Sequence, residues 1–300
     1  MTHLVSLISD HLLPNYLFIK EMEGKYDDLL FVTTEKMHIA DIGARLEKAL
    51  GVEKGSIRRI IVSEEDLNKT VGKLESIPFA DDERFIVNLT CGTKIMSIGV
   101  YNFFSRFESS FYYIPIGKNK IENVGTSEDI PLNYRVNLHE YLTLYGLRYT
   151  NDITDKKLVE SEGAKFEVDI YNRLKNELKL QNDFIFRGVK LFREDSEKMN
   201  DNEIDVMWAM DNQIYVGECK VSLSRPMTTV PEYLDQIMYK LAAISKDFGL
   251  RVNPYIFTKH YFTRGAFNEK RMSAIQKRMK ILGIKGLLGC KELNKSKLKI

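Results

Sequence analysis

The chain has 300 residues, 44% of them apolar, which is enough for two globular domains with buried cores. Its formal net charge of +2 is too small to indicate an acidic or a basic partner. The three cysteines, Cys91, Cys219 and Cys290, are too far apart for a disulfide framework or a zinc cluster, and they predict a cytoplasmic protein.

The two ends of the sequence bear on location and partners. The first twenty residues are fairly apolar, but they contain Asp10, His11 and Pro14 and lack a basic start, so we expect no signal peptide. No apolar stretch is long enough to cross a membrane, so we expect no membrane partner. From Arg271 onward there are nine Lys or Arg residues and one acid, Glu292, which fits a nucleic-acid surface and a solvated tail about equally.

Up to about residue 116, short apolar strands alternate with helical stretches. This order predicts an α/β domain whose parallel sheet is covered by helices on both faces. Sheets of this kind bind ligands at the carboxyl ends of their strands. The expected strands are Leu4–Ser9, Leu29–Thr34, Ile57–Val62, Arg84–Thr90 and Ser110–Ile116, and the expected helices are Met37–Leu50, Glu65–Ile77 and Lys94–Phe107.

Polar residues follow three of these strands and predict a phosphate-binding rim. Gly92 would let the backbone approach a phosphate, Lys94 adds charge, and the start of the helix offers free N–H groups. Helix capping by Thr90 or Thr93 is the alternative explanation. Neither a GxGxxG fingerprint nor a Walker lysine loop occurs, which disfavours a dinucleotide or an NTPase site. The candidate ligand-binding residues are Ser9, Asp10, Pro14, Asn15, Thr33, Thr90, Gly92, Thr93 and Lys94.

The second half of the chain has a different order of elements. Residues 117–151 are polar and irregular apart from one short helix, which predicts a linker. The expected elements after it are a helix Leu158–Leu178, a strand Phe184–Phe192, a hairpin, a helix Glu232–Lys246, a strand Tyr255–Thr258 and a helix Asn268–Leu282.

The hairpin is the most informative part of this half. A tight turn at Asp211-Asn212 would place Asp205 directly opposite Glu218, and Glu203 opposite Lys220. Two facing carboxylates repel each other, and a divalent cation between them would turn that repulsion into binding. An ordinary surface hairpin with a Glu203–Lys220 ion pair is the alternative, and it leaves the Asp205–Glu218 pair unexplained.

The hairpin resembles the PD-(D/E)xK nuclease signature, with Ile204 in place of the usual proline. The resemblance covers about residues 155 to 285 and implies a restriction-endonuclease-like fold. Asp205, Glu218 and the backbone carbonyl of Cys219 would then hold Mg²⁺ or Mn²⁺. Lys220 would orient the attacking water or stabilise developing negative charge.

Two helices of this half carry weaker candidates. In related nucleases an acid on the first helix reaches the metal, which makes Glu167 a candidate catalytic residue, although helix surfaces carry glutamates routinely. Gln236, Tyr239 and Lys240 lie on the helix after the hairpin, where such folds support the site or touch nucleic acid. Plain amphipathic packing is the alternative for each of them.

The first half resembles the CARF domain, a Rossmann-like sensor of cyclic oligoadenylates, over about residues 1 to 130. The segment Asn88–Lys94 carries this resemblance, with Cys91 where familiar members have glycine. Together the halves are similar to the Card/Can effectors of type III CRISPR defence, which are homodimers that bind cyclic tetra-adenylate most often. The implied organisation is a sensor at 1–130, a linker with a connecting helix at 131–151 and a nuclease at 152–300.

The implied function is a metal-dependent nuclease that a cyclic oligoadenylate activates and that cuts DNA, RNA or both. A catalytically inactive, nucleotide-responsive regulator that binds nucleic acid is one alternative. An enzyme that degrades the cyclic ligand in its first domain is another. The choice between DNA and RNA stays open, because nonspecific nucleases need backbone charge and stacking for either substrate.

Overall fold

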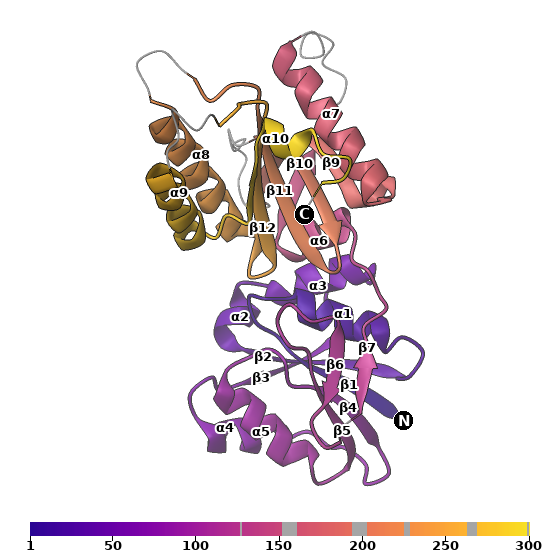
Figure 1. Ribbon diagram of the computed structural model, residues 1–300. Coiled ribbons are helices and arrows are strands. Elements are labelled where there is room, and N and C mark those ends of the chain that lie inside the picture. The colour runs from indigo at the N-terminus through magenta and orange to yellow at the C-terminus, as the bar shows by residue number, and fades with distance from the viewer. Residues whose placement is uncertain (127, 152–160, 194–202, 225–228, 263–268, 299) are drawn as a thin grey trace. The chain divides into compact units, whose positions relative to one another are not determined.

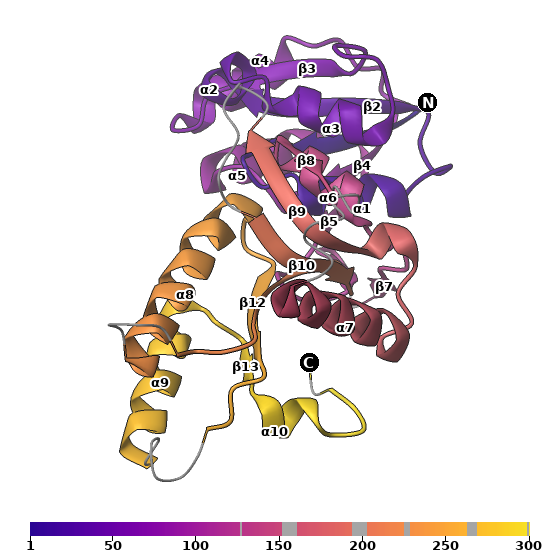
Figure 2. The same cartoon turned by 90° about the horizontal axis from the view of Figure 1, so that it is seen from above.

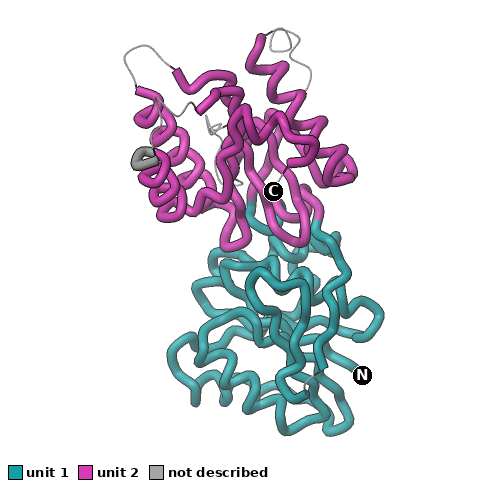
Figure 3. Tube along the Cα trace, viewed as in Figure 1, with its two compact units in different colours: residues 1–136, 143–146 teal, residues 137–142, 147–300 magenta. Residues whose placement is uncertain are grey.

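The computed structural model describes residues 1–126, 128–151, 161–193, 203–224, 229–262, 269–298 and 300 (Figure 1). Residues 152–160, with the expected start of the first nuclease helix, therefore lie outside the described residues. The chain divides into two compact units (Figure 3). Unit 1 comprises residues 1–136 and 143–146, and unit 2 comprises residues 137–142 and 147–300.

Unit 1 is built on a seven-stranded sheet with the strand order β3-β2-β1-β4-β5-β6-β7. The first five strands are parallel, and β6 and β7 are antiparallel additions at one edge. The strands are β1 (Thr2–Leu7), β2 (Asp28–Thr34), β3 (Arg58–Val62), β4 (Arg84–Asn88), β5 (Glu108–Tyr113), β6 (Lys120–Asn123) and β7 (Asp129–Pro131). The helices are α1 (Leu13–Glu21), α2 (Glu35–Ile39), α3 (Ile42–Leu50), α4 (Leu67–Glu75) and α5 (Lys94–Phe104), and α6 (Leu138–Leu144) is shared between the units.

The core of unit 1 explains why these strands read as continuous apolar runs. Val5 and Leu7 of β1 pack in one cluster with Val87 of β4 and with Met96 and Val100 of α5. Helices α4 and α5 cover this face of the sheet, and α1 and α3 cover the other (Figures 1 and 2). Central strands covered on both faces have no solvent side, so almost every position must be apolar.

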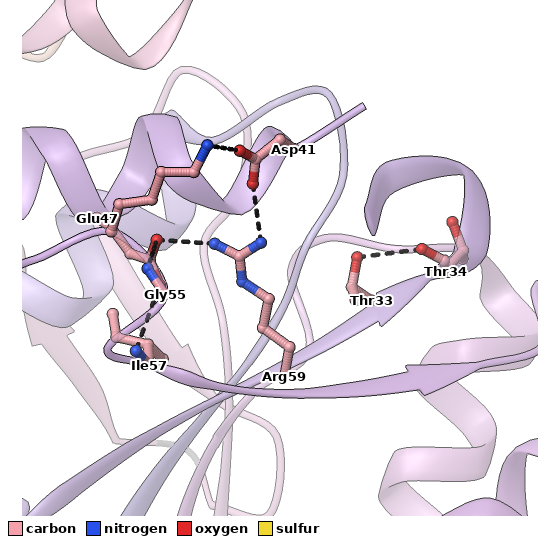
Figure 4. A network of polar contacts seen from close by, with 8 residues as sticks. Thr33, Thr34, Asp41, Glu47, Gly55, Ile57 and Arg59 are labelled. Carbon is pink, nitrogen blue, oxygen red and sulfur yellow. Dashed lines mark hydrogen bonds and ion pairs between the residues drawn. The ribbon is translucent and has the colours of Figure 1, made fainter. Parts of the chain in front are cut away.

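A buried charge network fixes α3 to the sheet (Figure 4). Glu47 of α3 is 1% exposed and accepts hydrogen bonds from the backbone N–H groups of Gly55 (2.9 Å) and Ile57 (3.3 Å). Arg59 of β3 bridges Glu47 (2.7 Å) and Asp41 (2.9 Å). Because every charge in the network has a partner, burial of Glu47 is tolerated.

Several sequence-based expectations for unit 1 need correction. The single helix expected at Met37–Leu50 is two helices, broken at Asp41, which adopts the left-handed conformation with φ 50°. The stretch after β1, for which no helix was expected, continues into α1, with Pro14 in the first turn where its missing N–H costs nothing. Residues 117–151, expected to be irregular, contain β6 and β7, and they also contain β8 (Leu147–Thr150), which joins the sheet of unit 2.

Unit 2 contains a six-stranded sheet with the strand order β13-β12-β11-β10-β9-β8. Strands β8 to β11 run antiparallel to their neighbours, whereas β11, β12 and β13 are parallel. The strands after β8 are β9 (Ile185–Arg193), β10 (Glu203–Met210), β11 (Gln213–Lys220), β12 (Val252–Thr258) and β13 (Gly286–Leu288). The helices are α7 (Glu162–Glu177), α8 (Val230–Ser245), α9 (Glu269–Leu282) and α10 (Cys290–Leu293).

Helices lie on both faces of this sheet, with α7 on one side and α8 and α9 on the other (Figures 1 and 2). Phe166 and Ile170 of α7 pack with Val206, Trp208 and Cys219. Within the described residues, no helix is long and apolar enough to cross a membrane.

The hairpin β10–β11 has the expected turn. Asp211 (φ 52°) and Asn212 (φ 58°) both adopt the left-handed conformation, as a two-residue turn of this kind requires. The expected order of a helix, three strands, a helix and a strand is confirmed, and β13 and α10 extend it.

Candidate functional site

The register of the hairpin brings two acids together. The β10–β11 pairs run from Met210–Gln213 to Val206–Gly217, and one further step in this register sets Asp205 opposite Glu218. The backbone N–H of Cys219 donates a 2.6 Å hydrogen bond to Asp205 Oδ2. Asp205 (9% exposed) and Glu218 (3% exposed) are both buried, so their charges depend on nearby partners.

Two lysines supply these partners. Lys220 Nζ lies 2.7 Å from Glu218 Oε1 and 3.6 Å from Asp205 Oδ2. Lys240 reaches from α8 and donates to Glu218 Oε1 at 3.2 Å and Oε2 at 3.0 Å. The ammonium of Lys220 is therefore paired with Glu218 and lies near Asp205. The alternative of an ordinary surface hairpin predicts an ion pair with Glu203 instead.

Burial and mutual repulsion dominate the electrostatics of the acids. Burial, reinforced by the negative charge of Glu218, raises the pKa of Asp205 to about 7. Burial also raises the pKa of Glu167 on α7, and repulsion by Glu203 and Glu218 adds to it. Burial disfavours the charged form of Lys220, but the two carboxylates outweigh that effect and raise its pKa.

The donor set fits a hard divalent cation. Mg²⁺ is commonly held by one or two carboxylates, with water and phosphate oxygens completing the shell, and Asp205 and Glu218 provide that pair. Burial disfavours the charged form of Asp205 and raises its pKa, and a bound cation would stabilise that charged form. Within the described ranges, no group of three or more His, Cys, Asp or Glu side chains forms a metal cluster by itself.

The structure places the remaining nuclease candidates as follows. Glu167 is half-buried on α7, and its pKa responds to the charges of Glu218 and Lys220. The carbonyl of Cys219 accepts a 3.1 Å hydrogen bond from Lys220, and its thiol points into the core on the α7 side of the sheet. The contact of Lys240 with Glu218 is shown only by the structure. The sequence could not distinguish Lys240 from ordinary packing residues of its helix.

In unit 1 the polar strand ends meet where the strand order reverses. Strand β1 lies between β2 and β4, so the carboxyl ends of β1 and β4 frame the crevice in which open α/β sheets bind ligands. Cys91, which follows β4, donates from its buried thiol to the carbonyl of His11, which follows β1, at 3.3 Å. The two loops are thus tied together at this edge.

Two of the rim candidates, Asn15 and Thr90, make hydrogen bonds within the domain itself. Asn15 is 0% exposed and donates to the carbonyl of Leu7 at 2.7 Å. Asn88, also 0% exposed, donates to Asn15 and accepts from both the backbone and the hydroxyl of Thr90. The hydroxyl of Thr90 in turn accepts from the backbone N–H of Ile114 at 2.9 Å.

The remaining rim candidates range from exposed to buried. Gly92 (φ 80°), Thr93 and Lys94 are exposed at the start of α5. Thr93 caps this helix by accepting from the N–H of Met96 at 3.2 Å, so the capping interpretation of Thr93 is confirmed. Asp10 is exposed, Ser9 and Pro14 are half-buried, and Thr33 is buried.

Comparison with known families assigns both halves of the chain. Residues 3–141 match the model of the Card1 CARF domain, and residues 155–298 match that of the Card1-like endonuclease domain. The chain belongs to the Card1 family. Its organisation is therefore a CARF domain followed by a Card1-like endonuclease domain, which confirms the resemblance seen in the sequence.

Solved structures share this fold along nearly the whole chain. Can2 from Sulfobacillus thermosulfidooxidans in complex with cyclic tetra-adenylate is 18% identical, with a TM-score of 0.73 over 98% of this chain and 97% of that one. Protein VC1899 from Vibrio cholerae is 14% identical, with a TM-score of 0.71 over 97% and 95%. A type III CRISPR defence DNA nuclease activated by cyclic oligoadenylate is 14% identical, with a TM-score of 0.60 over 87% and 46%.

A curated relative matches a shorter stretch of this Card1-family chain. The CRISPR-associated endoribonuclease Cas13a of Leptotrichia wadei is 25% identical over 121 residues. The match covers 39% of this chain, and the chain spans only 10% of the length of that relative.

Proposed function

We propose that this Card1-family chain is a nuclease that cuts nucleic acid with a divalent metal and is switched on by a cyclic oligoadenylate. The observation that carries the proposal is the buried Asp205–Glu218 pair with Lys220 beside it, on adjacent strands of the endonuclease domain. A structural hairpin gains nothing from two buried, facing carboxylates, whereas a metal-dependent nuclease needs them.

The residues divide the work of phosphodiester cleavage. Asp205 and Glu218 would hold Mg²⁺ or Mn²⁺, which supplies a more acidic bound water and neutralises charge on the phosphate. Lys220, held 2.7 Å from Glu218, keeps a positive charge beside the reacting phosphate and stabilises the negative charge that develops there. Glu167 approaches the same centre from α7 and would hold a proton or a metal-bound water.

The CARF domain would bind the activator at the crevice between the ends of β1 and β4. Gly92, Thr93 and Lys94 offer exposed backbone and charge to a phosphate there. Asn15 and Thr90 would hold the backbone around this crevice in place through their hydrogen bonds to Leu7 and Ile114. The similar structure of Can2 contains cyclic tetra-adenylate, and we propose that ligand, bound by a homodimer, for this chain as well.

A cleavage assay tests this function. The wild type should cut supercoiled plasmid, single-stranded DNA or RNA in Mn²⁺ and cyclic tetra-adenylate, and omission of the ligand or addition of EDTA should abolish cutting. Glu218→Ala should lose at least a hundredfold in rate. Glu162→Ala, which removes an exposed acid from α7, is the matched control and should behave as the wild type. Equal cutting by wild type and Glu218→Ala would show that any cutting does not depend on this acid pair, and absence of cutting by the wild type would favour the regulator without catalysis.

A further inference from the structure

The endonuclease domain contains a hollow near the carboxyl ends of its parallel strands, at the same end of the sheet as the acid pair. This hollow, of about 520 Å³, lies between the chain that follows β12, helix α9 and the start of α10. This volume is within the range of sites that bind small ligands. Its wall includes Tyr261, Phe262, Met272, Gln276, Leu287 and Lys291.

The sheet topology sets the spacing between the end of β11, which carries Glu218 and Lys220, and the end of β13, which leads into the wall of the hollow. Strands β11, β12 and β13 are parallel, and their pairing aligns Lys220 with Thr258 and Phe257 with Leu288. One further step in the second register aligns Thr258 with Gly289. Lys220 and Gly289 are therefore about two strand spacings apart, or roughly 10 Å. This is the length of about three stacked nucleotides.

The two aromatic rings differ in how they are held. Phe262 packs against Gly289, where a Cβ atom would come within 2.8 Å of the ring, and its centroid lies 5.2 Å from that of His260. The backbone N–H of Cys290 donates to the carbonyl of His260 at 3.2 Å and closes this arrangement. Tyr261 beside it is 61% exposed. One ring is thus fixed and its neighbour is free to meet a ligand.

The polar groups around the rings suit a nucleotide. Gln276 offers both an acceptor and a donor to the edge of a base. Lys291 is exposed and offers a positive charge to a phosphate. The acid of the wall, Glu292, is already engaged, because it accepts from the backbone N–H of Gly289 at 3.2 Å. Aromatic faces with nearby basic groups are the usual means of holding single strands without sequence preference.

We propose that this hollow is a base-binding subsite for a single strand of nucleic acid. One unstacked base of the strand lies on the rings of Tyr261 and Phe262, with Lys291 against its phosphate. The same strand then passes along the carboxyl ends of β12 and β11 to the Asp205–Glu218 pair. The subsite rests on the proposed nuclease function for its role, but base binding is measurable without any cleavage.

The test measures affinity by fluorescence anisotropy in EDTA, with and without cyclic tetra-adenylate. The probes are labelled single-stranded DNA, single-stranded RNA, a fully abasic DNA strand and a blunt duplex. Tyr261→Ala should weaken binding of at least one base-bearing single strand about tenfold and leave the abasic strand and the duplex unchanged. Tyr261→Phe should bind as the wild type, because the ring face is retained.

A second variant tests the charge. Lys291→Ala should weaken all strands alike and reduce the slope of log affinity against log salt by about one. Ile281→Ala, at an 83% exposed position of α9, and Lys285→Ala, at the opposite end of β13, are the matched controls and should change nothing. Unchanged emission of Trp208 would show that each variant is folded, because Trp208 lies in the core of this domain.

The outcomes separate this subsite from the nuclease function. Equal weakening of base-bearing and abasic strands by Tyr261→Ala, or no weakening of any strand, would overturn the subsite whatever the cleavage assay shows. A base-dependent loss of affinity together with equal cutting by wild type and Glu218→Ala would retain the subsite and overturn the proposed metal site. The DNA and RNA probes show which strand the subsite accepts.

Discussion

Lys240 on α8, 22 residues further along the sequence, donates to both carboxylate oxygens of Glu218, at 3.2 and 3.0 Å. Lys220 lies 2.7 Å from the first of these oxygens. One buried carboxylate is therefore held between two ammonium groups. A metal ion that binds Glu218 must share this carboxylate with the lysines or displace one of them.

The first prediction concerns Lys240. Removal of a positive charge near a cation site favours the cation, so Lys240→Met should lower the Mn²⁺ concentration for half-maximal cleavage severalfold at pH 8. Lys240→Arg should stay close to the wild type, because it keeps the charge. Lys246→Ala, at the exposed end of α8, is the control. A higher Mn²⁺ requirement for Lys240→Met would contradict this and make Lys240 a support that orients Glu218.

The part of the site that the sequence predicts is its local part. Asp211 and Asn212 tolerate positive φ, so the turn fixes the register and hence the facing of Asp205 and Glu218. The contact of Lys240 with Glu218 depends on how α8 packs against β11, which no local pattern encodes.

The same contrast between local patterns and long-range packing explains which parts of the CARF domain could be predicted. The parallel strands are predictable because strands buried on both faces leave long apolar runs. Strands β6 and β7 are short and carry several polar residues, so their sequence resembles that of loops. Asn15 looks like any polar loop residue, although its side chain is fully buried and bonded to Leu7.

The second prediction contrasts two polar residues of the rim. Lys94→Ala should weaken binding of cyclic tetra-adenylate about tenfold and leave the melting temperature unchanged, because Lys94 is exposed. Asn15→Ala should lower the melting temperature by several degrees, because it leaves a buried carbonyl without its donor. Calorimetric titration and differential scanning fluorimetry measure the two effects. Lys69→Ala on α4 is the control, and equal affinity of Lys94→Ala and wild type would remove Lys94 from the ligand site.

The third prediction concerns the buried carboxylate of α3. Glu47→Gln should lower the free energy of unfolding of the CARF domain by about 2–3 kcal/mol, because Arg59 loses a charged partner within a buried network. Glu108→Gln is the matched control. Its partner Arg84 lies at 3.1 Å, but both side chains are exposed, so we expect less than about 1 kcal/mol. Hydrogen exchange of the β2 and β3 amides localises the effect, and similar losses in both variants would contradict it.

The fourth prediction follows from the cysteines. Burial raises the pKa of the Cys91 thiol to about 12 and that of Cys219 well above its usual range. Since the thiolate is the reactive form, burial keeps Cys91 and Cys219 protonated and slow to react at pH 8, and a higher pH increases the ionised fraction. Iodoacetamide should therefore label the partly exposed Cys290 first in the native protein, and all three cysteines in 6 M urea. Peptide mass spectrometry measures the rates. Labelling of Cys219 as fast as Cys290 would mean that β11, the strand that carries Glu218, opens readily. The proposed metal site would then lack the rigid backbone on which it depends.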